Sequence, residues 1–164
     1  MSNIQVQESQ PAPDFILPAI GSDDVVKEDQ VQLSALRGHD VVLYFYPKDD
    51  TPGCTVEACS FRDANHVLQQ RGIVVLGVSK DSVSSHQKFV EKYSLPFPLL
   101  ADTDTTVAQL YGAYGEKTSY GKTYMGVIRK TFLIDKDGIL RKIWHKVKPE
   151  GHASEVLAAV EELL

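Results

Sequence analysis

The sequence contains only two cysteines among its 164 residues, Cys54 and Cys59. Two thiols are too few for a disulfide framework and too few for a zinc site made of thiolates alone. The five histidines show no HxxxH pairing and do not lie at zinc-finger spacing from the cysteines. We therefore predict no metal site, and redox chemistry becomes the leading use of the two thiols.

The sequence also has no long hydrophobic run and no excess of basic residues. No stretch approaches the roughly 18 consecutive apolar residues of a membrane-spanning helix, which argues against a membrane protein. The net charge of -5 lacks the basic footprint that phosphate neutralisation requires, so we predict no nucleic-acid partner. The first ten residues have neither a basic region nor an apolar region of a secretory signal, and we expect a cytoplasmic protein.

Length and composition fit one globular domain. Hydrophobic residues make up 43% and charged residues 24% of the chain, as in ordinary globular proteins. A chain of 164 residues can bury a core without disulfide or metal staples. We predict a flexible N-terminal lead-in over residues 1–12, which is polar and proline-containing, followed by a single domain over residues 13–164.

Hydrophobic patterning predicts alternating strands and helices. Continuous apolar runs over residues 41–46 and 73–79 are typical of strands buried on both faces, and the first should be central. The other predicted elements are a short edge strand (14–19), an extended piece with one helical turn (31–38), helices (54–70, 82–93, 153–163), a short strand (97–101), a helical turn or two (105–110) and an antiparallel hairpin (130–135 with 139–144). This order predicts an α/β fold with a central mixed sheet and helices on both faces.

The segment 112–122 is glycine-containing but carries neither GxGxxG nor GxxxxGK[ST]. We therefore interpret it as a surface loop near the pocket, not as a nucleotide-binding loop. The aromatic residues Tyr44, Phe45, Tyr46 and Trp144 are interpreted as core or pocket wall.

Cys54 begins the helix that follows the first buried strand. A cysteine in the first turn of a helix meets unpaired backbone N–H groups and the positive end of the helix dipole. Both favour the thiolate over the thiol, so this position predicts a reactive cysteine. The arrangement, with a hairpin near the end of the chain, resembles a thioredoxin fold.

The spacing Pro47-x-x-x-Thr51-x-x-Cys54 resembles the active-site signature of peroxiredoxins. The surrounding residues resemble the bacterioferritin-comigratory-protein or Q-type subfamily from about residue 13 to the C-terminus. The segments that carry this resemblance are residues 45–49, 51–63, 115–117, 120–122 and 129–135.

This resemblance implies a role for each residue of the site. Cys54 would be the peroxidatic nucleophile, Thr51 would offer its hydroxyl to the peroxide oxygens, and Pro47 would shield the thiolate from water and from over-oxidation. Arg129 would complete the pocket, polarising the peroxide and holding the thiolate, as suits a planar donor of fixed charge. The backbone N–H groups of Gly53 and Cys54 would add donors at the helix start.

Cys59 is the internal candidate for capturing the sulfenic acid that forms on Cys54. On an ideal helix, residues five apart have Cα atoms roughly 8.6 Å apart, beyond the roughly 7 Å limit for a disulfide. An intramolecular bond would therefore require the first turns of the helix to unwind. The alternative is a small helix residue without a redox role, and the resemblance favours the resolving role.

The resemblance thus implies a thiol peroxidase that reduces hydrogen peroxide and alkyl hydroperoxides, is recycled by thioredoxin or a similar dithiol, and works as a monomer without a cofactor. A thioredoxin-like dithiol oxidoreductase is the principal alternative, but Thr51 stands where the first cysteine of its C-x-x-C would be. A redox sensor or holdase-like binding module that uses Cys54 as a switch is the other alternative.

Overall fold

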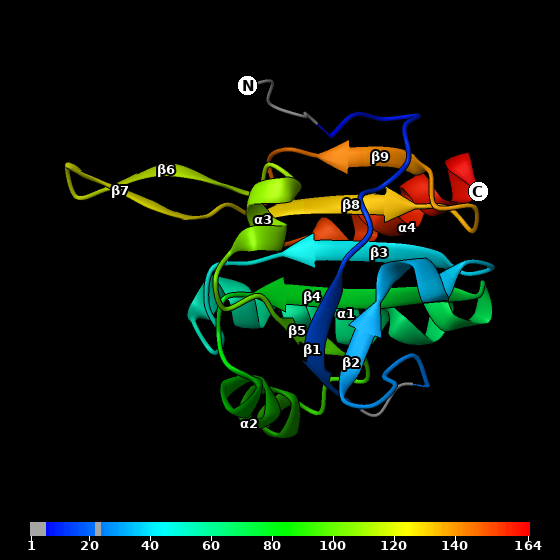
Figure 1. The fold of residues 1–164 in the computed structure, drawn as a ribbon, viewed down its shortest axis with the longest axis horizontal. Helices are drawn as coiled ribbons and strands as arrows, with labels where there is room; N and C mark the ends of the chain where they lie inside the picture. Colours follow the sequence, from blue (N-terminus) through cyan, green and yellow to red (C-terminus); the bar gives the residue numbers. More distant parts are fainter. Residues whose placement is uncertain (1–5, 22–23) are drawn as a thin grey trace.

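The computed structural model describes residues 6–21 and 24–164 of the chain (Figure 1). Its elements alternate between strands and helices, as the hydrophobic patterning predicted. In chain order they are β1 (Ile16–Ile20), β2 (Gln30–Gln32), the 3-10 helix η1 (Leu33–Leu36), β3 (Asp40–Phe45), α1 (Pro52–Gln70), β4 (Ile73–Ser79), α2 (Val83–Tyr93), β5 (Leu99–Ala101), α3 (Thr106–Leu110), β6 (Tyr114–Ser119), β7 (Lys122–Val127), β8 (Lys130–Ile134), β9 (Leu140–Trp144) and α4 (His152–Leu163).

Seven strands form one mixed sheet in the order β2-β1-β5-β4-β3-β8-β9. Strands β3, β4 and β5 run parallel to one another, whereas β8 and β9 add antiparallel pairs on the β3 side and β1 and β2 add antiparallel pairs on the β5 side. The α/β fold with a central mixed sheet is confirmed, and β3 is a central strand. The predicted edge position of residues 14–19 is wrong, because β1 pairs on both sides and β2 forms the edge.

The side chains of β3 explain why the sheet is covered on both faces. Val42 and Tyr44 alternate with Leu43 and Phe45, and all four are fully buried. The first pair packs with residues of α1 and α4, and the second with residues of α3 and the N-terminal segment. Alternation across a strand with both sides apolar requires a layer on each face. Figure 1 shows α4 behind the strands and α3 in front of them.

The segment predicted as a surface loop over residues 112–122 is instead part of a two-stranded hairpin, β6 with β7. Tyr120 and Gly121 connect the strands, and both have positive φ angles, 51° and 76°. Two-residue connections of this kind match the twist of a hairpin. Most of its residues are exposed, so no alternation of apolar and polar positions marked the strands. Figure 1 shows this hairpin extending away from the main sheet.

The predicted lead-in is described from residue 6 onward. Ser9 N donates to Leu140 O at 2.7 Å, and Ala12 N donates to Gly138 O at 2.8 Å. These bonds tie residues 9–12 to the β8–β9 connection and to β9. The domain boundary at residue 13 stays a prediction. Within the described residues, no helix combines the length and the apolarity needed to cross a membrane.

Candidate active site

Cys54 is the third residue of α1, directly after the loop that follows β3. Thr51 is the N-cap with an extended backbone, and Pro52 occupies the first helical position, where its missing N–H costs no hydrogen bond. The first backbone bond of the helix runs from Thr55 N to Thr51 O. The N–H groups of Gly53 and Cys54 precede that bond in the first turn of the helix, and Cys54 is only 1% exposed.

Arg129 reaches this sulfur from a distant part of the chain. It lies between β7 and β8, and its Nη2 donates to Cys54 Sγ at 3.2 Å. Its Nη1 donates to Glu57 Oε1 at 2.7 Å. A planar guanidinium presents donors in a fixed fork, so one side chain can hold the sulfur and a carboxylate together. A positively charged donor therefore lies directly at the sulfur of Cys54.

Gly53 leaves the space that Arg129 occupies. A Cβ atom built on Gly53 would lie 2.8 Å from Arg129 Nη2, a separation that forces one of the two groups to move. The glycine is helical, so its φ angle does not require glycine. Its function in the first turn of α1 is therefore spatial, since any larger residue would push the guanidinium away from the sulfur.

Glu57 belongs to the site although the sequence analysis did not single it out. It lies three residues after Cys54, on the same face of the helix one turn later, and is 1% exposed. Burial raises the pKa of its carboxyl to about 7, and the charge and hydrogen bond of Arg129 oppose that rise. Glu57 Oε2 has no hydrogen-bond partner among the described residues. The helical i, i+3 spacing from Cys54 was the available signal.

Pro47 and Thr51 lie in the β3–α1 loop and are half-buried. The hydroxyl of Thr51 donates to Lys48 O at 3.0 Å, which closes the loop on itself just before the helix begins. The structure thus brings Cys54, Arg129 and Glu57 into direct contact, with Pro47 and Thr51 on the adjoining loop.

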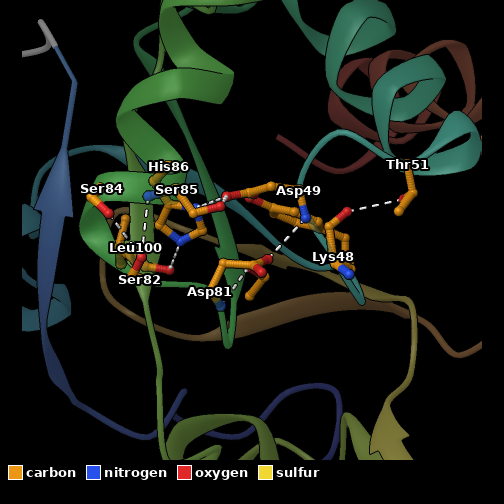
Figure 2. A network of polar contacts seen from close by, with 11 residues as sticks. Lys48, Asp49, Thr51, Asp81, Ser82, Ser84, Ser85, His86 and Leu100 are labelled. Carbon is orange, nitrogen blue, oxygen red and sulfur yellow. Dashed lines mark hydrogen bonds and ion pairs between the residues drawn. The ribbon is translucent and has the colours of Figure 1, made fainter.

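Two neighbouring carboxylates tie this loop to α2. Asp49 is buried, and His86 Nδ1 lies 2.7 Å from its Oδ2, as Figure 2 shows. Asp50 is exposed and accepts hydrogen bonds from Lys92 Nζ at 2.8 Å and from the Tyr93 hydroxyl at 2.9 Å. Sequence reasoning missed both contacts, because each joins residues more than thirty positions apart.

A lysine of the β6–β7 hairpin bonds to the last residue of β7, two positions before Arg129. Lys117 Nζ donates to Val127 O at 2.9 Å. Burial lowers the pKa of Lys117, and the charge of Arg129 lowers it further. Lys117 thus lies close enough to Arg129 to interact with its charge, in agreement with the prediction that the 112–122 segment is near the pocket.

Cys59 is on the same helix as Cys54, is partly exposed and, like Cys54, is a free thiol. The two residues are therefore held apart by intact helix in this conformation. In the part of the chain that the structure describes, no group of three or more His, Cys, Asp or Glu side chains is arranged to hold a metal ion.

Comparison with known proteins gives one consistent result. Residues 9–143 match the model of the AhpC/TSA family. The chain is 50% identical over 154 residues to a putative peroxiredoxin bcp of Coxiella burnetii, covering 94% of this chain and 98% of that one. It is 47% identical over 135 residues to peroxiredoxin Bcp of Bacillus subtilis, covering 82% and 86% of the two chains.

Solved structures agree with these relatives. A structure that addresses the alkyl peroxide reduction activity of the Xanthomonas campestris bacterioferritin comigratory protein matches with a TM-score of 0.81 at 39% identity, covering 90% of each chain. A cysteine mutant of Xylella fastidiosa PrxQ matches with a TM-score of 0.86 at 34% identity, covering 96% of each chain. These neighbours confirm the predicted thioredoxin fold of the peroxiredoxin type.

Proposed function

The chain belongs to the AhpC/TSA family and is a peroxiredoxin of the bacterioferritin-comigratory-protein or Q-type group, and from this premise we propose that Cys54 reduces hydrogen peroxide and organic hydroperoxides. One observation carries the proposal: Arg129 Nη2 lies 3.2 Å from Cys54 Sγ at the start of α1. A charged donor and the helix N-terminus together favour an anionic sulfur nucleophile.

In the first step the thiolate attacks the nearer oxygen of the hydroperoxide. A sulfur–oxygen bond forms, the oxygen–oxygen bond breaks, and the departing alkoxide or hydroxide takes up a proton to leave as alcohol or water. Cys54 becomes a sulfenic acid. Negative charge moves from sulfur to the departing oxygen, so donors aimed at that oxygen lower the barrier. We assign this role to Arg129, whose Nη2 lies 3.2 Å from Cys54 Sγ, and to the backbone N–H groups of Gly53 and Cys54 at the helix start.

The loop residues supply the remaining groups. Thr51 would turn its hydroxyl from Lys48 O to the peroxide, and Pro47 would exclude water from the sulfur. Both residues are half-buried next to the helix start, which supports this assignment. Holding the peroxide against the sulfur in a dry pocket contributes through orientation rather than through new bonds.

In the second step we infer that Cys59 resolves the sulfenic acid. Its thiolate attacks Cys54 Sγ, a disulfide forms, and the hydroxyl leaves as water after protonation. Because Cys54 is 1% exposed and shares one intact helix with Cys59, the first turns of α1 must unwind for this step. Unwinding would separate Cys54 from Arg129 and expose the disulfide.

In the third step a dithiol protein of the thioredoxin type would reduce the disulfide by thiol–disulfide exchange. Two electrons pass from the reductant to the peroxiredoxin, and the free thiols allow α1 to refold. A buried Cys54 is inaccessible to another protein, which supports an unwound oxidised form as the species that the reductant meets.

Mass spectrometry of the intact protein after one equivalent of peroxide tests the proposal. The wild-type protein should lose two hydrogens as the internal disulfide forms, Cys59→Ser should gain one oxygen, and Cys54→Ser should remain unchanged. A Cys54→Ser protein that consumes peroxide as fast as the wild type would refute the assignment. A Cys59→Ser protein that still turns over at the wild-type rate with thioredoxin would refute the resolving step alone.

A further inference from the structure

We propose that the buried pair Asp49 and His86 is a positioning unit that holds the loop of Pro47 and Thr51 in place for the reaction of Cys54. The inference rests on the proposed function and adds residues that never touch the peroxide. Asp49 stands between Pro47 and Thr51, while His86 belongs to α2, so the pair links the reacting loop to a separate helix.

Both carboxylate oxygens of Asp49 are fully engaged. The Tyr46 hydroxyl donates to Oδ1 at 2.6 Å, and Ser85 Oγ donates to Oδ2 at 2.8 Å, where His86 Nδ1 also lies at 2.7 Å. The donors come from the end of β3 and from the first turn of α2. Three directed bonds on a side chain that is only 8% exposed fix the position of Asp49 on two elements at once.

His86 is held equally firmly. Its Nδ1 faces the Asp49 carboxylate and its Nε2 faces Leu100 O on β5 at 2.9 Å. Both partners are acceptors, so each ring nitrogen faces an oxygen that can accept a hydrogen bond. His86 has no exposed surface, so the loss of either contact would leave a buried polar group without its partner. Such a loss is costly, which makes this link hard to break.

The backbone of the loop is fixed by a second carboxylate. Asp81 Oδ2 accepts from Asp49 N at 2.9 Å, as Figure 2 shows. It also accepts from Ser79 Oγ at 2.6 Å, at the end of β4. Asp49 therefore links the loop to α2 and to the segment after β4, and through His86 to β5. Reactions that depend on orientation are sensitive to shifts of about 1 Å in the groups that hold the substrate.

Asp50 provides a matched control on the same loop. It contacts the same helix through Lys92 and Tyr93, but on the surface of the molecule, where an ion pair contributes little. Its φ angle of 56° also suits asparagine, so Asp50→Asn is a mild change. Asp49→Asn is the same chemical change one residue earlier and turns an accepting oxygen into a donor that faces donors.

The test compares two reactions of Cys54 in each variant: oxidation by hydrogen peroxide, which needs the aligned loop, and alkylation by iodoacetamide, which needs only an accessible thiolate. For Asp49→Asn we expect the ratio of the peroxide rate constant to the alkylation rate constant to fall by about 10-fold or more. For Asp50→Asn the ratio should change by less than about twofold. An Asp49→Asn ratio equal to that of the wild type would overturn the proposal.

Two substitutions of His86 separate positioning from bulk stability. Asparagine places its amide nitrogen at the position of Nδ1, and glutamine places its amide nitrogen at the position of Nε2. His86→Asn therefore keeps the link to Asp49, and His86→Gln keeps only the link to Leu100 O. We expect His86→Asn to retain more of the peroxide-to-alkylation ratio than His86→Gln by about 5-fold or more, at similar melting temperatures.

These variants also decide the case in which Asp49→Asn fails to fold. Equal ratios in His86→Asn and His86→Gln would refute the positioning role, because only one of them keeps the contact with the loop. If the wild-type Cys54 itself proves inert toward peroxide, the proposed function fails, whereas a reactive wild type with unchanged variants refutes only the role of the pair.

Discussion

Two buried carboxylates lie near Cys54, and they are satisfied to different degrees. Asp49 receives three hydrogen bonds on two oxygens, and its partner His86 contacts an acceptor with each ring nitrogen. Glu57 has one oxygen on Arg129 and another without a partner among the described residues. Burial accordingly raises the pKa of Glu57 to about 7.

This difference in hydrogen bonding distinguishes the network that holds the loop from the group that contacts Arg129 beside Cys54. A saturated network has one favourable arrangement and resists change, which suits the loop that carries Pro47 and Thr51. In the proposed reaction, charge moves from the sulfur of Cys54 to a departing oxygen, and Arg129 would stabilise both. Its partner Glu57 uses only one oxygen for Arg129 and would therefore compete less for the guanidinium than a carboxylate that binds it with both oxygens. Polar groups left incompletely satisfied in a protein interior cost stability, and such costs concentrate at functional sites.

The largest expected effect comes from Arg129→Lys. Lysine keeps the charge but has no planar fork, so it cannot donate to Cys54 Sγ and to Glu57 Oε1 in the present geometry. We expect the rate constant with hydrogen peroxide to fall by about 100-fold, as for the loss of one transition-state donor. Stopped-flow oxidation of the reduced protein measures it, and a wild-type rate would show that charge alone suffices.

Glu57→Gln tests the incompletely satisfied carboxyl through the pH dependence of stability. The folded state holds a proton on Glu57 that the unfolded chain releases, since the pKa rises from 4.5 to about 7 on folding. The contribution of Glu57 to the free energy of unfolding is therefore fully present below pH 4.5 and is lost as the pH rises toward about 7.

Denaturant unfolding of the reduced wild type over this pH range should show that the free energy of unfolding falls by on the order of 2 kcal/mol. The Glu57→Gln variant should not show this fall. Parallel curves for the two proteins would contradict the assignment. The corresponding Asp49→Asn series serves as the comparison within the saturated network.

Gly53→Ala probes the space for Arg129. Alanine favours a helix over glycine, so the substitution should not lower the helix propensity of α1. Its Cβ would nevertheless lie 2.8 Å from Arg129 Nη2 and displace the guanidinium. We expect the peroxide rate constant to fall by about 10-fold, because the donor moves off the sulfur. An unchanged rate constant in a well-folded variant would mean that the Arg129 guanidinium can move to make room for the alanine without slowing the reaction.

The smallest effect distinguishes two tyrosines of the same strand region. Tyr44 and Tyr46 are both fully buried, but only the Tyr46 hydroxyl has a hydrogen-bond partner, Asp49, in the described part of the chain. Tyr46→Phe should lower the free energy of unfolding by about 1 kcal/mol, whereas Tyr44→Phe should leave it unchanged or raise it. Equal losses in urea titrations would show that the Tyr44 hydroxyl also contributes.

Local patterns predicted much of the fold. The buried runs of β3 and β4 and the helix beginning near Cys54 were expected at nearly the observed bounds, because apolar runs and helical periodicity are local signals. The β6–β7 hairpin was missed, since strands exposed on both faces carry no period-2 pattern. The edge position of β1 was wrong, because strand order depends on long-range pairing.

The residues of the candidate site likewise fall into those that the sequence indicated and those that only the structure revealed. Cys54, Thr51 and Pro47 lie within eight residues, and motif spacing predicted them together, with Arg129 added through the family resemblance. Their assignment to chemical steps stays a proposal. The role of Glu57, the space that Gly53 leaves for Arg129 and the Asp49–His86 pair emerged only in three dimensions, because each depends on which side chains meet there.

By itself, the sequence determined that a thiol follows a buried strand at the start of a helix, because hydrophobic runs, caps and turns act over a few residues. The tertiary structure alone decided which groups surround that sulfur. Arg129 is 75 positions away and His86 lies 37 positions from Asp49, and such contacts form only when the sheet and helices pack. Packing also buries both carboxylates, and it supplies Asp49 with three contacts while it leaves one oxygen of Glu57 without a hydrogen-bond partner among the described residues.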